Sequence, residues 1–209
     1  MFINLVNIIA LCTYNVCMSK VIVHIDLNAF FARCEEIRDP SLENKPVAIG
    51  HDGRGGIVST CSYAARKYGV GSAIPMFKAR QLCPNLIIIP GDYHYYSTMS
   101  KKFFNFVRRY TKLVEPASVD ECFADFTDTV KGQKDVVVFF RKLQDDLFKE
   151  TGLKCSIGVS TTRFLAKMAS DYQKPMGLTI IHKRDIESIL FPLKVESMFG
   201  VGKRTAPIS

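Results

Sequence analysis

Two adjacent carboxylates, Asp120 and Glu121, constrain this chain more than any other pair of its residues. They lie between two extended runs, 113–117 and 122–126. Side chains of consecutive strand residues point to opposite faces, so the two acids converge only if the backbone turns there. The pattern predicts a tight hairpin that presents both carboxylates at its end. A solvated turn, where acidic residues are common, is the alternative.

A third acid, Asp26, follows the apolar run 21–25 and so has the same position at the end of a strand. Adjacent anions repel each other, and a divalent cation held by oxygen ligands relieves that repulsion. Three carboxylates at the ends of neighbouring strands are typical of a site for one or two Mg²⁺ ions that align and neutralise a phosphoryl group. We therefore expect Asp26, Asp120 and Glu121 to be metal ligands.

The composition permits a buried core and favours an anionic partner. The 209 residues suit one ordinary domain or two small ones, and 47% of them are hydrophobic. The formal charge of +8 favours polyanions such as nucleic acid. Seven cysteines without a Cys-x-x-Cys pair and four dispersed histidines indicate neither a zinc site nor a disulfide framework. Reduced thiols suit a cytoplasmic location.

Residues 1–17 form an uncharged, largely apolar stretch. The stretch lacks the basic segment of a signal peptide, and asparagines interrupt it before it is long enough to span a membrane. We therefore expect the fold to start at Met18, with 1–17 as a leader outside it and no association with a membrane.

Hydrophobic periodicity predicts alternating strands and helices along the rest of the chain. Strands are expected at 20–25, 45–50, 56–60, 86–89, 113–117, 122–126, 153–160 and 178–181. Helices are expected at 28–37, 61–69, 75–83, 93–110, 134–149, 162–171 and 183–190, with one more turn at 195–199. Asn28 and either Thr161 or Thr162 are the expected N-caps of two of them. This order favours an α+β fold, an antiparallel-centred mixed sheet with helices on one face.

Three short patterns suit phosphate binding. Tyr63 and Arg66 share one face of their predicted helix, and a guanidinium beside a phenol suits phosphate oxygens. A surface arginine beside a half-buried tyrosine is the alternative. Lys174 lies where proline and glycine end a helix. A Gly-x-Gly turn at 200–202 either offers backbone N–H groups to a phosphate or caps a helix.

Taken together, six separated segments resemble the Y-family, DinB-type translesion DNA polymerases from about Met18 to the end of the chain. They occur in the order of that family at 24–31 (HIDLNAFF), 59–66 (STCSYAAR), 118–121 (SVDE), 166–171 (AKMASD), 174–177 (KPMG) and 200–202 (GVG). Each segment is modest by itself, and their joint order and spacing carry the resemblance.

The resemblance implies a division of the chain and a set of site residues. The implied units are a palm at 18–27 and 93–181, small α/β fingers at 28–92 and an incomplete helical thumb at 182–209. Two Mg²⁺ ions would be held by Asp26, Asp120, Glu121 and the carbonyl of Leu27. The dNTP would contact Phe31, Thr60, Tyr63, Arg66 and Lys174, and DNA would contact Gly200, Gly202 and Lys203. Phe31 would be the steric gate that excludes a ribose 2′-OH, and packing in the core is its alternative.

The implied activity is error-prone, template-directed DNA synthesis past damage, by two-metal transfer of a nucleotide from dNTP to the primer 3′-OH. The implied partners are primer–template DNA, dNTP and a sliding clamp, and the chain is expected to be a monomer. Two alternatives stay open: a nucleotide cyclase, which has a related palm, and a non-catalytic DNA-binding or regulatory fragment. The Tyr63, Arg66 and Lys174 set and the Gly-x-Gly turn favour the polymerase.

Family members continue through the thumb into a little-finger domain that grips the template. We therefore expect the 209-residue chain to bind primer–template DNA weakly. Affinity should fall steeply with added salt, because contacts to phosphates would dominate the binding. Fluorescence anisotropy of a labelled primer–template over a salt series measures this. Tight binding that resists salt would contradict the expectation.

Overall fold

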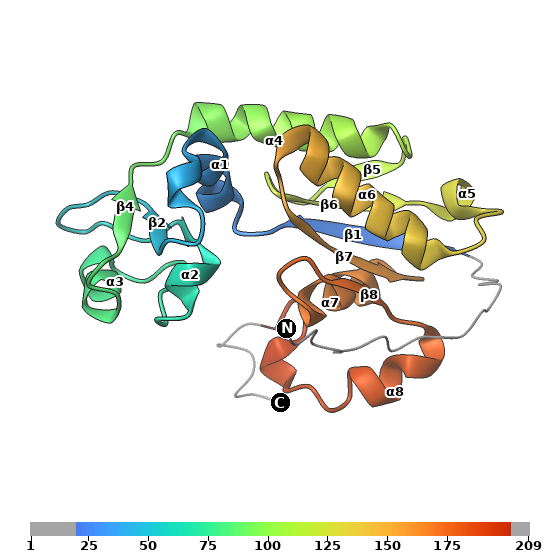
Figure 1. Cartoon of the computed structure of the whole chain (residues 1–209). Coiled ribbons are helices and arrows are strands. Elements are labelled where there is room, and N and C mark those ends of the chain that lie inside the picture. Colours follow the sequence, from blue (N-terminus) through green and yellow to red (C-terminus); the bar gives the residue numbers. More distant parts are fainter. Residues whose placement is uncertain (1–19, 202–209) are drawn as a thin grey trace, which may run out of the picture.

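A computed structural model describes residues 20–201 of the chain. The expected leader, the start at Met18, and the expected DNA contacts of Gly202 and Lys203 lie outside the described residues. Two sheets organise the described part (Figure 1). One has five strands in the order β5-β6-β1-β7-β8, and the other has three strands in the order β3-β2-β4.

The elements follow the predicted order closely. The strands are β1 (Ile22–Leu27), β2 (Val47–Ile49), β3 (Thr60–Cys61), β4 (Ile87–Ile89), β5 (Val114–Pro116), β6 (Glu121–Asp125), β7 (Cys155–Ser160) and β8 (Leu178–Ile180). The helices are α1 (Phe30–Arg38), α2 (Tyr63–Arg66), α3 (Met76–Leu82), α4 (Tyr93–Arg108), α5 (Thr127–Val130), α6 (Val136–Thr151), α7 (Arg163–Tyr172) and α8 (Ile186–Ile189), with 3₁₀ turns η1 (Pro40–Leu42), η2 (Lys183–Asp185) and η3 (Val195–Ser197). The sequence pattern does not predict α5. Among these helices, none is both long and apolar enough to cross a bilayer.

The prediction of an antiparallel-centred α+β sheet is confirmed. Strand β1 lies in the middle of the five-stranded sheet and pairs antiparallel with both β6 and β7. Within this five-stranded sheet only β7 and β8 are parallel, and α7 connects them as the crossover that a parallel pair requires. The near-continuous apolar sequence of β1 follows from this central position, because both of its faces are covered.

The expectation that the helices gather on one face of this sheet is wrong. Helices α4 and α6 cover one face, where Ile25 of β1 packs with Phe103 and Phe140 in the main core. Helix α7 covers the opposite face, where Ala166 packs against Ile22 (Figure 1). The crossover from β7 to β8 places α7 there, and this leaves the side chains of alternate β1 residues facing α7.

The three-stranded sheet has a smaller core of its own, which includes Ala48 of β2 and Met76 of α3. It is nevertheless continuous with the main core through α1 and β2. Phe30 of α1 and Ile49 of β2 belong to the same buried cluster as the residues of α4 and α6. Helix α1 therefore joins the two sheets instead of belonging to one of them.

Two expected N-caps have different outcomes. Thr162 caps α7, since its side chain accepts a hydrogen bond from the N–H of Leu165. Asn28 is wrong as the cap of α1, because Ala29 occupies that position without a side-chain bond. The buried Asn28 side chain instead donates to Ser156 Oγ at 3.0 Å and accepts from the N–H of Met176 at 2.8 Å. This long-range bonding satisfies the amide more completely than a cap would.

Gly158 of β7 is where α7 approaches the sheet most closely. A Cβ atom at Gly158 would collide with the backbone of Ala166 and Ser170 on α7. We expect Gly158→Ala to destabilise the fold by about 2 to 3 kcal/mol, because a helix backbone cannot yield as a side chain can. Urea unfolding measures the change. Gly71→Ala is the matched control, because a Cβ there meets nothing within 4 Å. Equal stabilities for the two variants would contradict the expectation.

Candidate functional site

The predicted hairpin at Asp120 and Glu121 is present. Strands β5 and β6 pair antiparallel, and the N–H of Ala117 donates to the carbonyl of Glu121 at 2.9 Å across the turn. Glu121 is the first residue of β6 and lies directly opposite Asp26 of β1. Asp120 lies in the turn, and its carbonyl accepts from the N–H of Leu27 at 2.9 Å. The three acids therefore gather where β1 and β6 meet.

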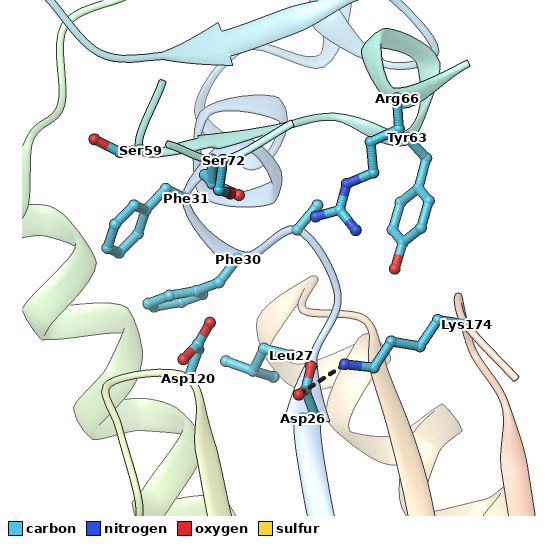
Figure 2. Close-up of a pocket in the computed structure, with 12 residues that line it drawn as sticks. Asp26, Leu27, Phe30, Phe31, Ser59, Tyr63, Arg66, Ser72, Asp120 and Lys174 are labelled. Carbon is cyan, nitrogen blue, oxygen red and sulfur yellow. Dashed lines mark ion pairs between the residues drawn. The ribbon is translucent and has the colours of Figure 1, made fainter. Parts of the chain in front are cut away.

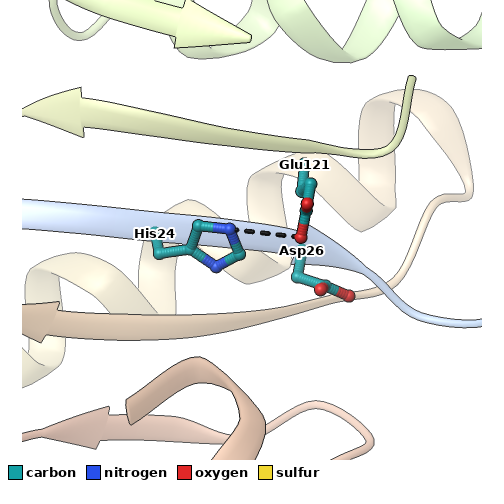
Figure 3. A group of neighbouring side chains, drawn as sticks. All are labelled: His24, Asp26 and Glu121. Atoms are coloured by element: carbon teal, nitrogen blue, oxygen red, sulfur yellow. Dashed lines mark ion pairs between the residues drawn. The ribbon is translucent and has the colours of Figure 1, made fainter. Parts of the chain in front are cut away.

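His24, Asp26 and Glu121 form a cluster in which one ligand atom of each lies within 4.8 Å of the others (Figure 3). His24 and Asp26 share one face of β1 because they are two residues apart. Glu121 joins them from β6, the neighbouring strand. His24 is not among the expected site residues, although its position two residues before Asp26 places it on the same strand face.

Most of the expected site residues line one cavity of about 280 Å³ between the two sheets (Figure 2). They are Asp26, Leu27, Phe31, Thr60, Tyr63, Arg66, Asp120 and Lys174. Ala29, Phe30, Ser59 and Ser72, which the sequence reasoning did not single out, complete the lining. Glu121 is not among the lining residues but lies beside Asp26. Gly200 does not line the cavity either. Gly200 has a φ of +87°, which fits the alternative of a glycine turn after η3.

The cavity has walls of opposite charge. Asp26 and Asp120 form one wall, and Arg66 with Tyr63 from α2 forms the other (Figure 2). The Arg66 guanidinium lies 4.6 Å from the centre of the Tyr63 ring, so the two residues predicted to share a helical face also contact each other. Burial raises the pKa of the Tyr63 hydroxyl, which therefore stays a neutral hydrogen-bond donor. This arrangement can take a ligand that carries both a metal and phosphates.

Burial raises the pKa of the Asp120 carboxyl, and the negative charges of Asp26 and Glu121 raise it further. A hydrogen bond from the Ser118 hydroxyl acts in the opposite direction. Because the negative charges of Asp26 and Glu121 both act on the pKa of Asp120, the three carboxylates interact electrostatically. An added cation would relieve this repulsion.

Two lysines pair with Asp26 and Glu121 in this structure. The ammonium group of Lys167, from α7, lies 2.7 Å from Glu121 and 3.2 Å from Asp26. That of Lys174 lies 2.8 Å from both Asp26 and Asp171. Burial opposes the charge of Lys167, but the hydrogen bond to Glu121 and the nearby Asp26 outweigh it and raise the lysine pKa. The site is therefore a dense network of opposite charges.

Lys167 and Asp171 belong to segment 166–171, one of the six that resemble the polymerase family, but the expected site residues do not include them. They are four residues apart on α7 and therefore lie on the same helical face. Their spacing of four residues is the feature of the sequence that could have indicated a shared role. What the sequence could not show is that α7 lies under β1, which brings Lys167 to Asp26 across 141 residues.

A hydrogen-bond chain fixes the imidazole of His24, which is completely buried. Ser170 Oγ lies 2.8 Å from His24 Nδ1, and the Ser170 hydroxyl donates to the carbonyl of Lys167, also at 2.8 Å. His24 Nε2 then faces Glu121 Oε2 at 3.3 Å. The orientation of Glu121 thus depends on α7 through both His24 and Lys167.

The pKa of Glu121 is lowered from 4.5 to about 2, first by its hydrogen bond with His24 and then by Lys167. Because the ionised form is favoured in the folded state, its contribution to stability is complete above about pH 4.5 and is lost as the pH falls toward about 2. We expect the difference in unfolding free energy between the unmodified chain and Glu121→Gln to shrink through this window.

Urea unfolding over a pH series, with EDTA present, measures that difference. Glu150→Gln, which removes an exposed carboxylate from α6, controls for the loss of one surface charge. A difference between the unmodified chain and Glu121→Gln that stays constant across the window would show that Glu121 is not held ionised by these contacts.

Comparisons with known proteins agree on one family. The family model described as impB/mucB/samB matches residues 25–171. The chain is 47% identical over 191 residues to DNA polymerase IV of Streptococcus pyogenes serotype M5 (strain Manfredo), and the match covers 90% of this chain and 52% of the relative. DNA polymerase IV of S. pyogenes serotype M1 is similar to the same extent. The chain spans about half the length of the curated relatives it matches.

Solved structures support the same conclusion. The "Crystal Structure of DinB from Sulfolobus solfataricus" matches with a TM-score of 0.83 and 29% identity over 90% of this chain and 56% of that one. The "Insertion ternary complex of Dbh DNA polymerase" matches with a TM-score of 0.82 and 30% identity over 88% of this chain and 55% of that one. Since the family model spans well over half of the chain, this protein belongs to the impB/mucB/samB family, the Y-family polymerases that its motifs resemble.

Proposed function

We propose that this chain is the catalytic part of a translesion DNA polymerase, which adds a nucleotide from dNTP to the 3′-OH of a primer paired with a template. One observation carries the proposal: a single cavity holds Asp26 and Asp120 on one wall and Arg66 with Tyr63 on the other. A DNA polymerase needs such an arrangement, because it must align a metal-bound triphosphate with an attacking hydroxyl. The similarity to DNA polymerase IV supports this reading over the cyclase and the non-catalytic fragment.

The donor set fits divalent ions that prefer oxygen. Asp26 and Asp120 line the cavity with Leu27, and Glu121 lies beside Asp26. Lys167 and Lys174 already place positive charge beside these carboxylates, which supports a site that attracts cations. We propose two Mg²⁺ ions, held by the three carboxylates and the carbonyl of Leu27. Bound there, they would neutralise the phosphoryl oxygens and the leaving group.

The chain's own residues would bind and orient the substrates. Arg66, Tyr63 and Thr60 would hold triphosphate oxygens by hydrogen bonds, with Arg66 contributing the largest share through its charged fork. Lys174 pairs with Asp26 in this structure, so a triphosphate would compete with that carboxylate for the lysine. Asn28 would support this exchange, because its bond to the N–H of Met176 fixes the segment that carries Lys174.

Phe31 would act on the sugar. Its ring lines the cavity on the side opposite Lys174 (Figure 2), where it would fill the space that a ribose 2′-OH needs. A ring that fills this space would exclude the additional hydroxyl by steric overlap, because closely packed side chains tolerate added atoms poorly. The core also partly buries Phe31, so packing and gating are compatible roles for the same ring.

We propose the division into units that the resemblance implies. The five-stranded sheet would be the palm (18–27 and 93–181), the three-stranded sheet the fingers (28–92), and the segment 182–209 part of a thumb. The two sheets support this division, although α1 packs into the core of the palm. A sliding-clamp partner, a monomeric state and a cytoplasmic location belong to the same proposal. The five cysteines in the described residues are buried and free, which suits a reducing compartment.

Asp120→Asn should reduce primer extension by about a hundredfold or more, because electrostatic alignment of the phosphates supplies most of the rate in phosphoryl transfer. The measurement is single-nucleotide insertion with Mg²⁺ present. Asp145→Asn is the matched control, since Asp145 is an exposed aspartate on α6, away from the cavity. Extension by Asp120→Asn at the rate of the unmodified chain would rule out the proposed role of Asp120. A cyclic nucleotide product without primer extension would favour the cyclase.

A further inference from the structure

The ring of Phe31 is held from behind by aromatic side chains at the start of α4. Tyr96 stacks on it, with ring centres 4.4 Å apart and ring planes inclined by 15°. Tyr93 meets it edge-on at 5.8 Å and 89°. Stacked and edge-on contacts each favour particular ring orientations, so together they restrict how Phe31 can turn.

Tyr96 itself is anchored to a buried carboxylate. Its side chain is 1% exposed, and its hydroxyl donates a hydrogen bond of 2.7 Å to Oε1 of Glu35, which is 4% exposed. Phe31 and Glu35 are four residues apart and lie on one face of α1. Tyr96 therefore contacts α1 twice, with its ring on Phe31 and its hydroxyl on Glu35, and the hydrogen bond fixes where the ring can lie.

The second oxygen of Glu35 connects this contact to the end of α1. Arg38 Nη1 lies 3.6 Å from Glu35 Oε2, and Arg38 Nη2 lies 2.8 Å from Asp92. Asp92 is the N-cap of α4 and accepts from the N–H of Tyr95. The same network therefore sets the position of α1 relative to the first turn of α4, from which Tyr96 projects.

Packing alone does not require a buried carboxylate at this position. Removing an ionised group from water costs several kcal/mol unless partners compensate, and an apolar residue of similar size is often at least as stabilising. Glu35 adds what an apolar side chain lacks, a directional bond that holds Tyr96 in one place. Directionality matters here because Tyr96 is the surface against which Phe31 rests.

We infer that Glu35, acting through Tyr96, positions the ring of Phe31 and so sets how strictly the cavity excludes a ribonucleotide. This inference rests on the proposed function and deepens it. Glu35 and Tyr96 do not line the cavity, so they are positioning residues and not catalytic ones. If their bond is lost, Phe31 can shift, and the space denied to a 2′-OH opens.

Tyr96→Phe tests the inference because it removes the hydroxyl and keeps the stacked ring. The measurement is kcat/KM for insertion of a dNTP and of the rNTP with the same base by the 209-residue chain. We expect the preference for dNTP to fall by about threefold or more, since small displacements at a substrate site have large kinetic effects. Glu35→Gln should lower the preference for dNTP by a smaller factor, because the amide oxygen still accepts a hydrogen bond.

Tyr110→Phe is the matched control. It also removes a tyrosine hydroxyl that contacts a carboxylate, that of Asp146, but beyond the opposite end of α4. The preference of the Tyr110→Phe variant for dNTP over rNTP should equal that of the unmodified chain. In a Phe31→Leu background, where the gate is already open, Tyr96→Phe should change the preference no further. That loss of effect is expected only if Tyr96 acts through Phe31.

The outcomes separate the inference from the proposed function. If the unmodified chain inserts no dNTP, the proposed function is wrong and the inference falls with it. If it inserts dNTP but Tyr96→Phe and Glu35→Gln lower both efficiencies equally, the pair serves stability alone and only the inference is overturned. If thermal melting shows that both variants are unfolded, the inference is overturned in the same way.

Discussion

The register between β1 and β6 places Asp26 opposite Glu121, and the rest of the site depends on that pairing. Side chains alternate along a strand, so a slip of one residue would turn Asp26 toward the apolar core and expose Ile25 to α7. The apolar residues of β1 that pack under α4 and α6 prevent such a slip. The core therefore fixes the register, and the register brings the acids together.

The clustered acids are paired with positive groups, and α7 supplies one of these, Lys167. Gly158 lets α7 lie directly on β7, and this close contact carries Lys167 to both Asp26 and Glu121. Ser170, one turn farther along α7, holds the ring of His24 toward Glu121. Because α7 provides Lys167 and positions His24 of β1 through Ser170, the charge and orientation of Glu121 are coupled to the packing of α7. Divalent ions would enter a site in which lysines pair with Asp26 and Glu121, while Asp120 still meets the negative charges of both other acids.

The opposite side of the cavity depends on a different kind of contact. Aromatic stacking and one buried hydrogen bond link α1 to α4, and the Arg38–Asp92 ion pair continues the link at the surface. Since α1 also belongs to the main core, the proposed fingers are attached to the proposed palm by packing as well as by the chain. Phe31 lies at this junction, so its position depends on how the two sheets meet.

The sequence by itself determined most of the elements, α5 excepted, and the hairpin, because local periodicity, turns and caps such as Thr162 depend on near neighbours. It also determined which short motifs carry acids, an arginine and a lysine, and the family resemblance supplied their expected roles. Only the tertiary structure decided that α7 covers the second face, that Asn28 bonds Met176 and not α1, and that His24 and Lys167 adjoin the acids. The contacts of Asn28 with Met176, of His24 with Glu121, and of Lys167 with Asp26 and Glu121 join residues 46 to 148 positions apart. No local pattern encodes them, because they arise when separate elements pack.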